Sequence, residues 1–278
     1  MSQPRLSNSG IQPAQVTGRQ KGRAPIQIPR LTLRFHVLII GRANAGKTTI
    51  LQRVCNTTEQ PKIFDPQGHE IKLSELNPTA QRGEHNIENQ MIFESNPGFV
   101  FHDSGGFEAG RSSELDDVKN FIKSYSKWLK VGNRLHVIWY CIPINDQARP
   151  ITRAELNFFD ECGTGRVPVL VLFTKADQLD AETIECLVNG GMSIEEAAIK
   201  APEESVIKFQ NSFGNQLYER KYPPKGHLYL RDMQTTSSHC NDLMEQTATV
   251  LSANSLKWLF FSVQQHHLSL SVQYAIMR

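Results

Sequence analysis

The chain has 278 residues, of which 39% are hydrophobic and 21% charged, a composition typical of a globular protein with a core of its own. Its formal net charge of +2 is too small to make nucleic acid or an anionic membrane the expected partner. The five cysteines are scattered and form no C-x-x-C pair, so they are expected to be reduced thiols of a cytoplasmic protein and not a disulfide frame or zinc site.

The first part of the chain is basic and rich in proline. Up to residue 34 it carries six Arg or Lys residues, no Asp or Glu, and four prolines. Such a segment buries too little apolar surface to offset its ordering entropy, so residues 1–33 are predicted to be a disordered basic arm. A mitochondrial presequence, which is also arginine-rich, is the minor alternative, although the prolines oppose the amphipathic helix that it requires.

The order of the remaining elements predicts an α/β fold of three layers. Continuous apolar runs at 34–40, 135–142 and 167–173 are typical of strands that are buried on both faces. Further strands are expected at 88–94, 99–103 and 227–230, and helical segments at 46–56, 112–130, 152–161, 180–220 and 241–277. Alternating strands and helices indicate a mainly parallel sheet, and the turn Asn96-Pro97-Gly98 adds one antiparallel edge strand.

These elements suggest one main domain over 34–240, with an insertion at about 180–225 and a helical region at 241–278. The insertion is a candidate for partner binding. The helical region is expected to pack on the main domain or to extend from it. Its apolar spacing continues beyond what a closing helix needs, so a second copy of the chain is a possible partner. Its most apolar part, 256–263, is too short to cross a bilayer, and no integral membrane segment is expected.

A phosphate-binding loop is predicted at residues 41–48, which read GRANAGKT. The pattern G-x-x-x-x-G-K-[ST] lies here between a predicted strand and a predicted helix, the context that the motif requires. Gly41 and Gly46 let the backbone fold around phosphates, and the helix that follows adds its positive end. Lys47 is expected to reach the β- and γ-phosphates, and the Thr48 hydroxyl to ligate Mg²⁺.

The base is predicted by Thr174-Lys175-Ala176-Asp177, directly after a buried strand. The carboxylate of Asp177 accepts two hydrogen bonds from guanine, whose N1–H and 2-amino group both donate. Adenine offers neither donor there and would leave the carboxylate unpaired, so the motif favours GTP and GDP. The stem of Lys175 is expected to lie over the purine. An ATP-binding enzyme remains an alternative, and it requires that Asp177 not meet the base.

A third motif, FHDSGGF, lies between the other two. Asp103 ends a predicted strand, and Gly106 follows at the spacing D-x-x-G. Asp103 is expected to hold Mg²⁺ through a water, and the Gly106 N–H to bond the γ-phosphate, so that the loop orders with GTP and relaxes with GDP.

With GRANAGKT, DSGG and TKAD in this order, the chain resembles the translation-factor-related (TRAFAC class) P-loop GTPases. The resemblance spans about residues 34–232. It is closest to uncharacterised fungal G-domain proteins with runs such as RGEHNIENQ and FHDSGGFE, and looser to septin, AIG1-like and Era/MnmE-type G domains. It implies a Mg²⁺-dependent GTP/GDP switch that hydrolyses GTP to GDP and phosphate, acting on a protein effector that the sequence does not identify.

Hydrolysis is expected to be slow, because Phe107 stands where the family places its catalytic glutamine. An apolar side chain cannot orient the attacking water, although Glu108 or a partner residue is an alternative source of that group. A second hypothesis is therefore a module that assembles or binds partners on GTP and turns over little. In the MnmE-type branch an asparagine at the place of Asn44 helps to bind potassium, so K⁺-stimulated hydrolysis is a further hypothesis.

Two family features are ambiguous in this sequence. The hydroxyl that closes over Mg²⁺ is assigned to Thr79, while Arg82 and His85 are alternatives that would face the phosphates. The loop over the guanine is expected near residues 230–232, where the family's Ser-Ala-Lys is absent. Ser252-Ala253-Asn254 imitates it but lies within a helical pattern and is interpreted as a decoy.

The complete expected site has a nucleotide-binding set and a metal set. The residues expected to bind the nucleotide are Gly41, Asn44, Ala45, Gly46, Lys47, Thr48, Thr49, Gly106, Thr174, Lys175 and Asp177. The residues expected to hold Mg²⁺ are Thr48, Asp103 and Thr79.

Overall fold

A computed structural model describes residues 33–71, 86–105, 112–126, 133–145, 150–235, 238 and 240–264. The chain divides into two units, Met1–Arg30 and Leu31–Arg278, and every described residue belongs to the second. Apart from Leu33, the basic arm predicted at 1–33 lies outside the described residues, so its disorder stays a prediction.

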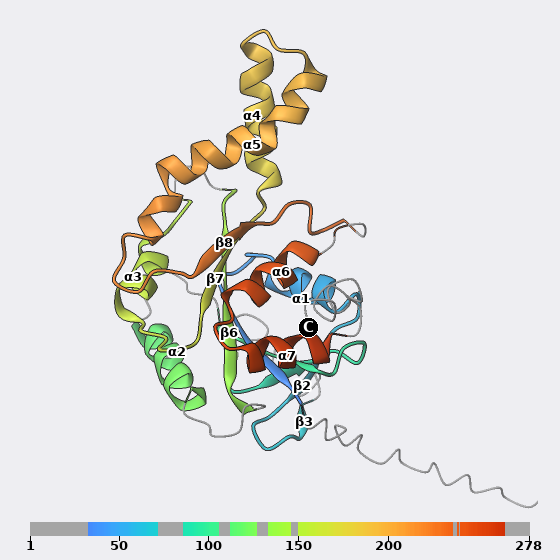
Figure 1. The fold of residues 1–278 in the computed structure, drawn as a ribbon, viewed down its shortest axis with the longest axis vertical. Coiled ribbons are helices and arrows are strands. Elements are labelled where there is room, and N and C mark those ends of the chain that lie inside the picture. Colours follow the sequence, from blue (N-terminus) through green and yellow to red (C-terminus); the bar gives the residue numbers. More distant parts are fainter. Residues whose placement is uncertain are drawn as a thin grey trace, which may run out of the picture. The chain divides into compact units, whose positions relative to one another are not determined.

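The described residues form an eight-stranded sheet in the order β3-β2-β4-β5-β1-β6-β7-β8. Figure 1 shows the sheet at the centre of the second unit. The strands are β1 (Phe35–Ile40), β2 (Lys62–Phe64), β3 (Glu70–Ile71), β4 (Gln90–Ile92), β5 (Phe99–Asp103), β6 (Leu135–Pro143), β7 (Val169–Thr174) and β8 (Gly226–Tyr229). In the part β5-β1-β6-β7-β8 each strand is parallel to its neighbours. In the part β5-β4-β2-β3 each strand is antiparallel to the next.

This sheet confirms the predicted fold class, a three-layer α/β architecture with a mainly parallel sheet and an antiparallel edge. The antiparallel part contains three strands where one was expected. β2 and β3 have three and two residues, too few to show the alternation by which a strand is recognised in a sequence.

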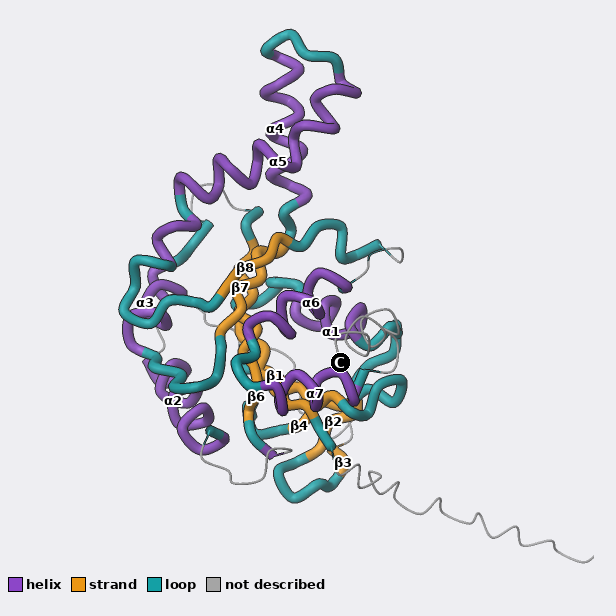
Figure 2. The backbone as a smooth tube through the Cα atoms, in the orientation of Figure 1, coloured by secondary structure: helices purple, strands orange, loops and turns teal. Residues whose placement is uncertain are grey.

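Helices cover both faces of the sheet (Figures 1 and 2). One face packs on α1 (Lys47–Val54), α6 (Asn241–Val250) and α7 (Asn254–Val263). The other packs on α2 (Ser112–Tyr125), α3 (Arg153–Glu161), α5 (Ile194–Ser212) and a 3₁₀ turn at Gly214–Leu217. In β1, Val37 and Ile39 belong to the first core and Leu38 and Ile40 to the second. Burial on both faces explains why the strand reads as a continuous apolar run.

The segment predicted as an insertion at 180–225 contains α5 and all but the first three residues of α4 (Asp177–Asn189), and the two helices form a hairpin. The two helices run side by side, and Figure 1 shows their connecting turn reaching away from the sheet. Ser193 caps α5 by accepting a hydrogen bond from the Glu196 N–H. No residue of α4 is fully buried, and α5 exposes Ile194, Ile199 and Ile207. That this hairpin is an insertion remains a prediction.

The helical region predicted at 241–277 is interrupted within its described part. Leu251 and Ala253 are extended, so Ser252-Ala253-Asn254 lies at the break between α6 and α7 and not inside a helix as expected. Leu251 is buried in the core, and the turn there directs the apolar side chains of α7 onto the sheet. A Cβ at Gly98 would stand 2.7 Å from the Val263 Cβ, so this glycine permits the close approach of α7 to the β4–β5 turn.

The helices of the described ranges include none with the length and apolar character needed to span a bilayer. The exact domain limits and the second copy of the chain stay predictions.

Candidate functional site

A cavity of about 630 Å³ lies where β1, β5 and β7 end. The carboxyl ends of parallel strands are where ligands bind in open α/β sheets. The cavity is lined by Asn44, Ala45, Gly46, Lys47, Thr48, Thr49, Asp103 and Lys175. The structure therefore brings together seven residues from three separate sequence motifs, with Thr49 directly after the first motif.

The loop between β1 and α1 has the backbone that its glycines allow. A Cβ at Gly41 would stand 2.5 Å from the Cys141 carbonyl oxygen, so only glycine lets the end of β1 lie this close to β6. Asn44 and Gly46 have φ angles of 60° and 82°, in the left-handed region. Gly46 then begins α1, whose first-turn N–H groups have no partners within the helix and give this end a positive potential.

Lys47 and Asp103 place opposite charges in the cavity. The Lys47 Nζ donates to the Gly41 carbonyl oxygen at 2.7 Å and lies 3.6 Å from Asp103 Oδ1. Thr48 is exposed and lines the same space. A hydroxyl and a carboxylate match the oxygen ligands that Mg²⁺ prefers, and Mg²⁺ sites often use one or two protein ligands and complete the shell with phosphates and water. The described residues contain no group of three His, Cys, Asp or Glu side chains placed for a metal.

Thr174 supports the loop from behind. Its buried hydroxyl donates to the Ala45 carbonyl oxygen at 2.9 Å, so the end of β7 anchors the loop between β1 and α1. It does not line the cavity, although it was expected to bind the nucleotide. A direct contact between Thr174 and a nucleotide stays a prediction, whereas the anchoring bond is a second role that the motif did not indicate.

Arg42 holds the outer part of the loop. Its Nη2 donates to the Pro143 and Pro150 carbonyl oxygens at 2.8 and 3.2 Å, and its Nε lies 3.4 Å from Glu155 Oε1. Glu155 also closes the capping box of α3 with Thr152, and burial raises the pKa of its carboxyl. Sequence reasoning missed these contacts because Arg42 occupies a variable position of the motif.

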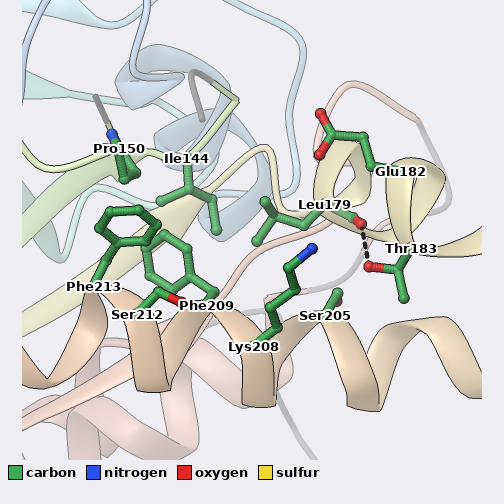
Figure 3. A pocket seen from close by; sticks show the side chains of 10 residues that line it. All are labelled: Ile144, Pro150, Leu179, Glu182, Thr183, Ser205, Lys208, Phe209, Ser212 and Phe213. Atoms are coloured by element: carbon green, nitrogen blue, oxygen red, sulfur yellow. Dashed lines mark hydrogen bonds between the residues drawn. The ribbon is translucent and has the colours of Figure 1, made fainter. Parts of the chain in front are cut away.

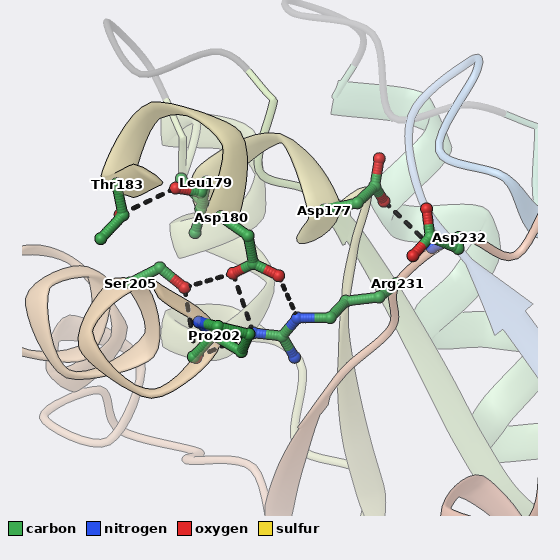
Figure 4. Close-up of polar contacts among 8 residues, drawn as sticks. All are labelled: Asp177, Leu179, Asp180, Thr183, Pro202, Ser205, Arg231 and Asp232. Carbon is green, nitrogen blue, oxygen red and sulfur yellow. Dashed lines mark hydrogen bonds and ion pairs between the residues drawn. The ribbon is translucent and has the colours of Figure 1, made fainter. Parts of the chain in front are cut away.

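The motif Thr174-Lys175-Ala176-Asp177, which is predicted to recognise the base, lies beside the loop that follows β8. Lys175 has φ 60° and lines the cavity, and Asp177 begins α4 two residues later. Asp177 Oδ1 accepts a hydrogen bond of 3.2 Å from the Asp232 N–H, as Figure 4 shows. The loop near 230–232, expected to lie over the base, is thus joined to the residue expected to read the base.

A chain of buried histidines fixes the strand that carries Asp103. His102 Nδ1 lies 3.2 Å from the Ile87 carbonyl oxygen, so it carries the proton, and Nε2 accepts from His36 Nδ1 at 3.1 Å. The His36 backbone N–H donates to His136 Nδ1 at 2.8 Å. Burial lowers the pKa of His102 to about 4, which keeps this ring neutral near pH 7. These three histidines connect β1, β5 and β6 next to Asp103, the predicted metal ligand.

A second, smaller cavity of about 170 Å³ lies between the helical hairpin and the end of β6 (Figure 3). It shares no lining residue with the first. It is lined by Ile144, Pro150, Leu179, Glu182, Thr183, Ser205, Lys208, Phe209, Ser212 and Phe213. Its floor is mainly apolar, and Glu182 and Lys208 bring one charge of each sign.

Several predicted positions fall outside the described residues. These are Thr79, Arg82, His85, Gly106, Phe107 and Glu108. The switch I hydroxyl, the γ-phosphate contact of Gly106 and the consequences of Phe107 therefore stay predictions.

No protein-family model matches the sequence. No curated protein matches it either. Among solved structures, the chain is similar to the septin GTPase domain from Chlamydomonas reinhardtii, with 17% identity over 80% of this chain and 71% of that one and a TM-score of 0.38. A likeness this distant leaves the assignment of function to the residues of the cavity itself.

Proposed function

We propose that the chain is a GTP-binding protein that uses Mg²⁺ and switches between GTP and GDP states, with slow intrinsic hydrolysis. The observation that carries the proposal is one cavity that combines Lys47, Thr48 and Asp103 with Lys175. Asp177 follows Lys175 by two residues, and its carboxylate accepts a hydrogen bond from the Asp232 N–H. Each of these groups has a distinct part in holding a guanine nucleotide.

The phosphates would occupy the loop at the start of α1. Backbone N–H groups of the loop and the positive helix end bind anionic oxygens, and Lys47 adds a full positive charge. Lys47 is already held toward the cavity by the Gly41 carbonyl, so little side-chain entropy is lost when phosphate arrives. Bound Mg²⁺ would neutralise phosphate charge, and Thr48 and Asp103 are the described residues that fit it.

The base would meet Lys175 and Asp177. The Asp232 N–H uses one acceptor site of the Asp177 carboxylate, and an ionised carboxylate has about four. Enough acceptors remain for the two donors on the edge of guanine. An adenine would present no donor pair to this carboxylate, and its binding would leave acceptors of Asp177 unpaired.

Slow turnover and partner binding are the finer parts of the proposal. Phe107 motivates both slow hydrolysis and the alternative function, a GTP-dependent assembly module with little or no turnover. Single-turnover hydrolysis together with size-exclusion chromatography in GTP and in GDP separates them. Release of phosphate without a change in size supports the switch, and a GTP-dependent increase in size without release supports the module.

Calorimetric titration with GTP, GDP and ATP in the presence of Mg²⁺ tests the proposed function. GTP and GDP are expected to bind at least 100-fold more tightly than ATP, because only guanine satisfies Asp177. Equal affinities for ATP and GTP would show that Asp177 does not meet the base, and the assignment would be wrong.

Potassium dependence is expected if Asn44 contributes a potassium ligand. The place of Asn44 in the cavity lining supports this role. The alternative is that asparagine stands here because it tolerates the left-handed conformation, with φ 60°, that the loop requires. Hydrolysis is expected to be several-fold faster in KCl than in NaCl, and Asn44→Ala should remove the difference without abolishing GTP binding. Equal rates in the two salts for the unmodified chain would contradict the hypothesis.

A further inference from the structure

We propose that Arg231 is a positioning residue for base recognition, which acts by locking the loop after β8 onto α4 through Asp180. The inference rests on the proposed function, because it assumes that Asp177 reads guanine. Arg231 itself need not touch the nucleotide. Its effect would pass through the backbone of Asp232 to the carboxylate of Asp177 (Figure 4).

Arg231 and Asp180 form a bidentate ion pair, which holds the loop after β8 on α4. Arg231 Nε donates to Asp180 Oδ2 at 2.5 Å, and Nη2 donates to Asp180 Oδ1 at 3.2 Å. The side chains of Arg231 and Asp180 are 28% and 13% exposed, so the pair is partly shielded from water. Two-point pairing fixes the orientation of the guanidinium as well as its position, which a single contact with a lysine would not do.

Two residues of α5 form hydrogen bonds with the same ion pair. Ser205 Oγ donates to Asp180 Oδ1 at 2.5 Å, and the Pro202 carbonyl accepts from Arg231 Nη2 at 3.0 Å. Three segments that are distant in sequence therefore meet at one ion pair. A displacement of the α4–α5 hairpin would therefore move Arg231 and, with it, the loop after β8 that contacts Asp177.

Further bonds hold the loop on both sides of Asp232. The Leu230 N–H donates to the Phe173 carbonyl at 2.8 Å, and the Ala176 N–H donates to the Leu230 carbonyl at 3.1 Å. Beyond Asp232, Arg53 of α1 donates to the Met233 and Gln234 carbonyl oxygens. Arg231 is the only residue among these whose side chain joins the loop to α4, the helix that Asp177 begins.

The lock matters because Asp232 has φ 49° and presents its N–H to Asp177 Oδ1 at 3.2 Å. This bond restricts rotation of the Asp177 carboxylate about its own axis. Guanine offers two donors side by side, so the carboxylate must keep one orientation to accept both. If Arg231 releases the loop, the Asp177 carboxylate gains alternative orientations. It then loses its bond to the guanine 2-amino group more readily than its bond to the N1–H.

The test compares GDP with IDP, whose base lacks the 2-amino group. The unmodified chain is expected to bind GDP about 10-fold more tightly than IDP, because IDP leaves one acceptor of Asp177 unpaired. In Arg231→Gln the ratio is expected to fall below about threefold, with Arg231→Lys between the two. Affinity for inorganic pyrophosphate, which has no base, should stay the same in all three chains.

Arg220→Gln is the matched control. Arg220 pairs with Asp160 at 3.3 Å and is 27% exposed, nearly the same as Arg231, but its pair lies between α3 and the 3₁₀ turn. This variant should keep the GDP to IDP ratio of the unmodified chain. Asp180→Asn keeps the shape of the partner and should lower the ratio in the same direction as Arg231→Gln, and the double variant should add little to either.

An unchanged GDP to IDP ratio in both Arg231→Gln and Asp180→Asn would overturn the inference, as would an equal fall in affinity for GDP, IDP and pyrophosphate. That second result would mean a general loss of structure. Failure of the proposed function has a different signature, because the unmodified chain would then show no preference for GDP over ADP.

Discussion

Lys47→Met is expected to lower the affinity for GTP by about 100-fold or more, corresponding to roughly 3 kcal/mol. Of the two cations in the loop at residues 41–48, Lys47 is the one that lines the cavity, while Arg42 pairs with Glu155. The Lys47 Nζ lies 3.6 Å from Asp103 Oδ1 in the same cavity. Methionine keeps much of the apolar stem but removes the charge and the donors. The negative charges of the phosphates and of Asp103 would then lack the positive charge of Lys47. The loss of GTP affinity should therefore exceed that caused by removing one neutral hydrogen bond.

Calorimetric titration with GTP and GDP measures this effect, and thermal unfolding without nucleotide shows whether the fold survives. Lys62→Met is the matched control, because Lys62 pairs with Glu94 on the antiparallel edge. Its loss should leave GTP affinity within about twofold, since the pair lies at a partly exposed position. If Lys47→Met binds GTP as well as the unmodified chain does, the nucleotide does not occupy this cavity.

The conformation of the loop at residues 41–48 was predictable because its determinants are local. Gly41, Gly46 and Lys47 lie within seven residues, and their conformations depend on backbone sterics that act over the same distance. The buried strands were predictable for a similar reason, since burial on both faces produces an unbroken apolar run. In both features the sequence signal is contained in one element, and sequence and structure agree there.

The contacts that stabilise the site were not predictable because their partners are distant in sequence. Arg42 reaches carbonyl groups about a hundred residues away, and Arg53 reaches the loop after β8 from α1. Neither arginine differs in its local sequence pattern from a solvated surface residue. The histidine chain of His36, His102 and His136 has the same property, because only strand order brings the three together.

The break between α6 and α7 was missed for a different reason. Helical periodicity continues through Leu251, so the apolar pattern gives no sign of the interruption. The structure makes Leu251 extended and buried, which indicates that core packing overrides the helical preference at this point. The short strands were missed for a related reason. The two residues of β3 are recognisable as a strand by their pairing with β2 and not by their own sequence.

Asp177→Asn is expected to exchange the preferred base from guanine to xanthine. An asparagine amide offers one acceptor and one donor group, whereas guanine presents two donors, so one guanine donor would face the donor of the amide. Xanthine has a carbonyl in place of the 2-amino group and matches the amide. Affinity for GDP should fall by about 100-fold, and affinity for XDP should rise above that of the unmodified chain.

The substitution leaves the rest of the site intact, which makes the result specific. The amide oxygen of asparagine can still accept the Asp232 N–H, so the loop after β8 keeps its bond to residue 177. Pyrophosphate affinity should not change, because Lys47 and the phosphate loop are untouched. Asp160→Asn, a carboxylate paired with Arg220 away from the cavity, should leave both nucleotide affinities unchanged. If Asp177→Asn loses GDP and gains no XDP, Asp177 supports the fold of the loop and does not read the base.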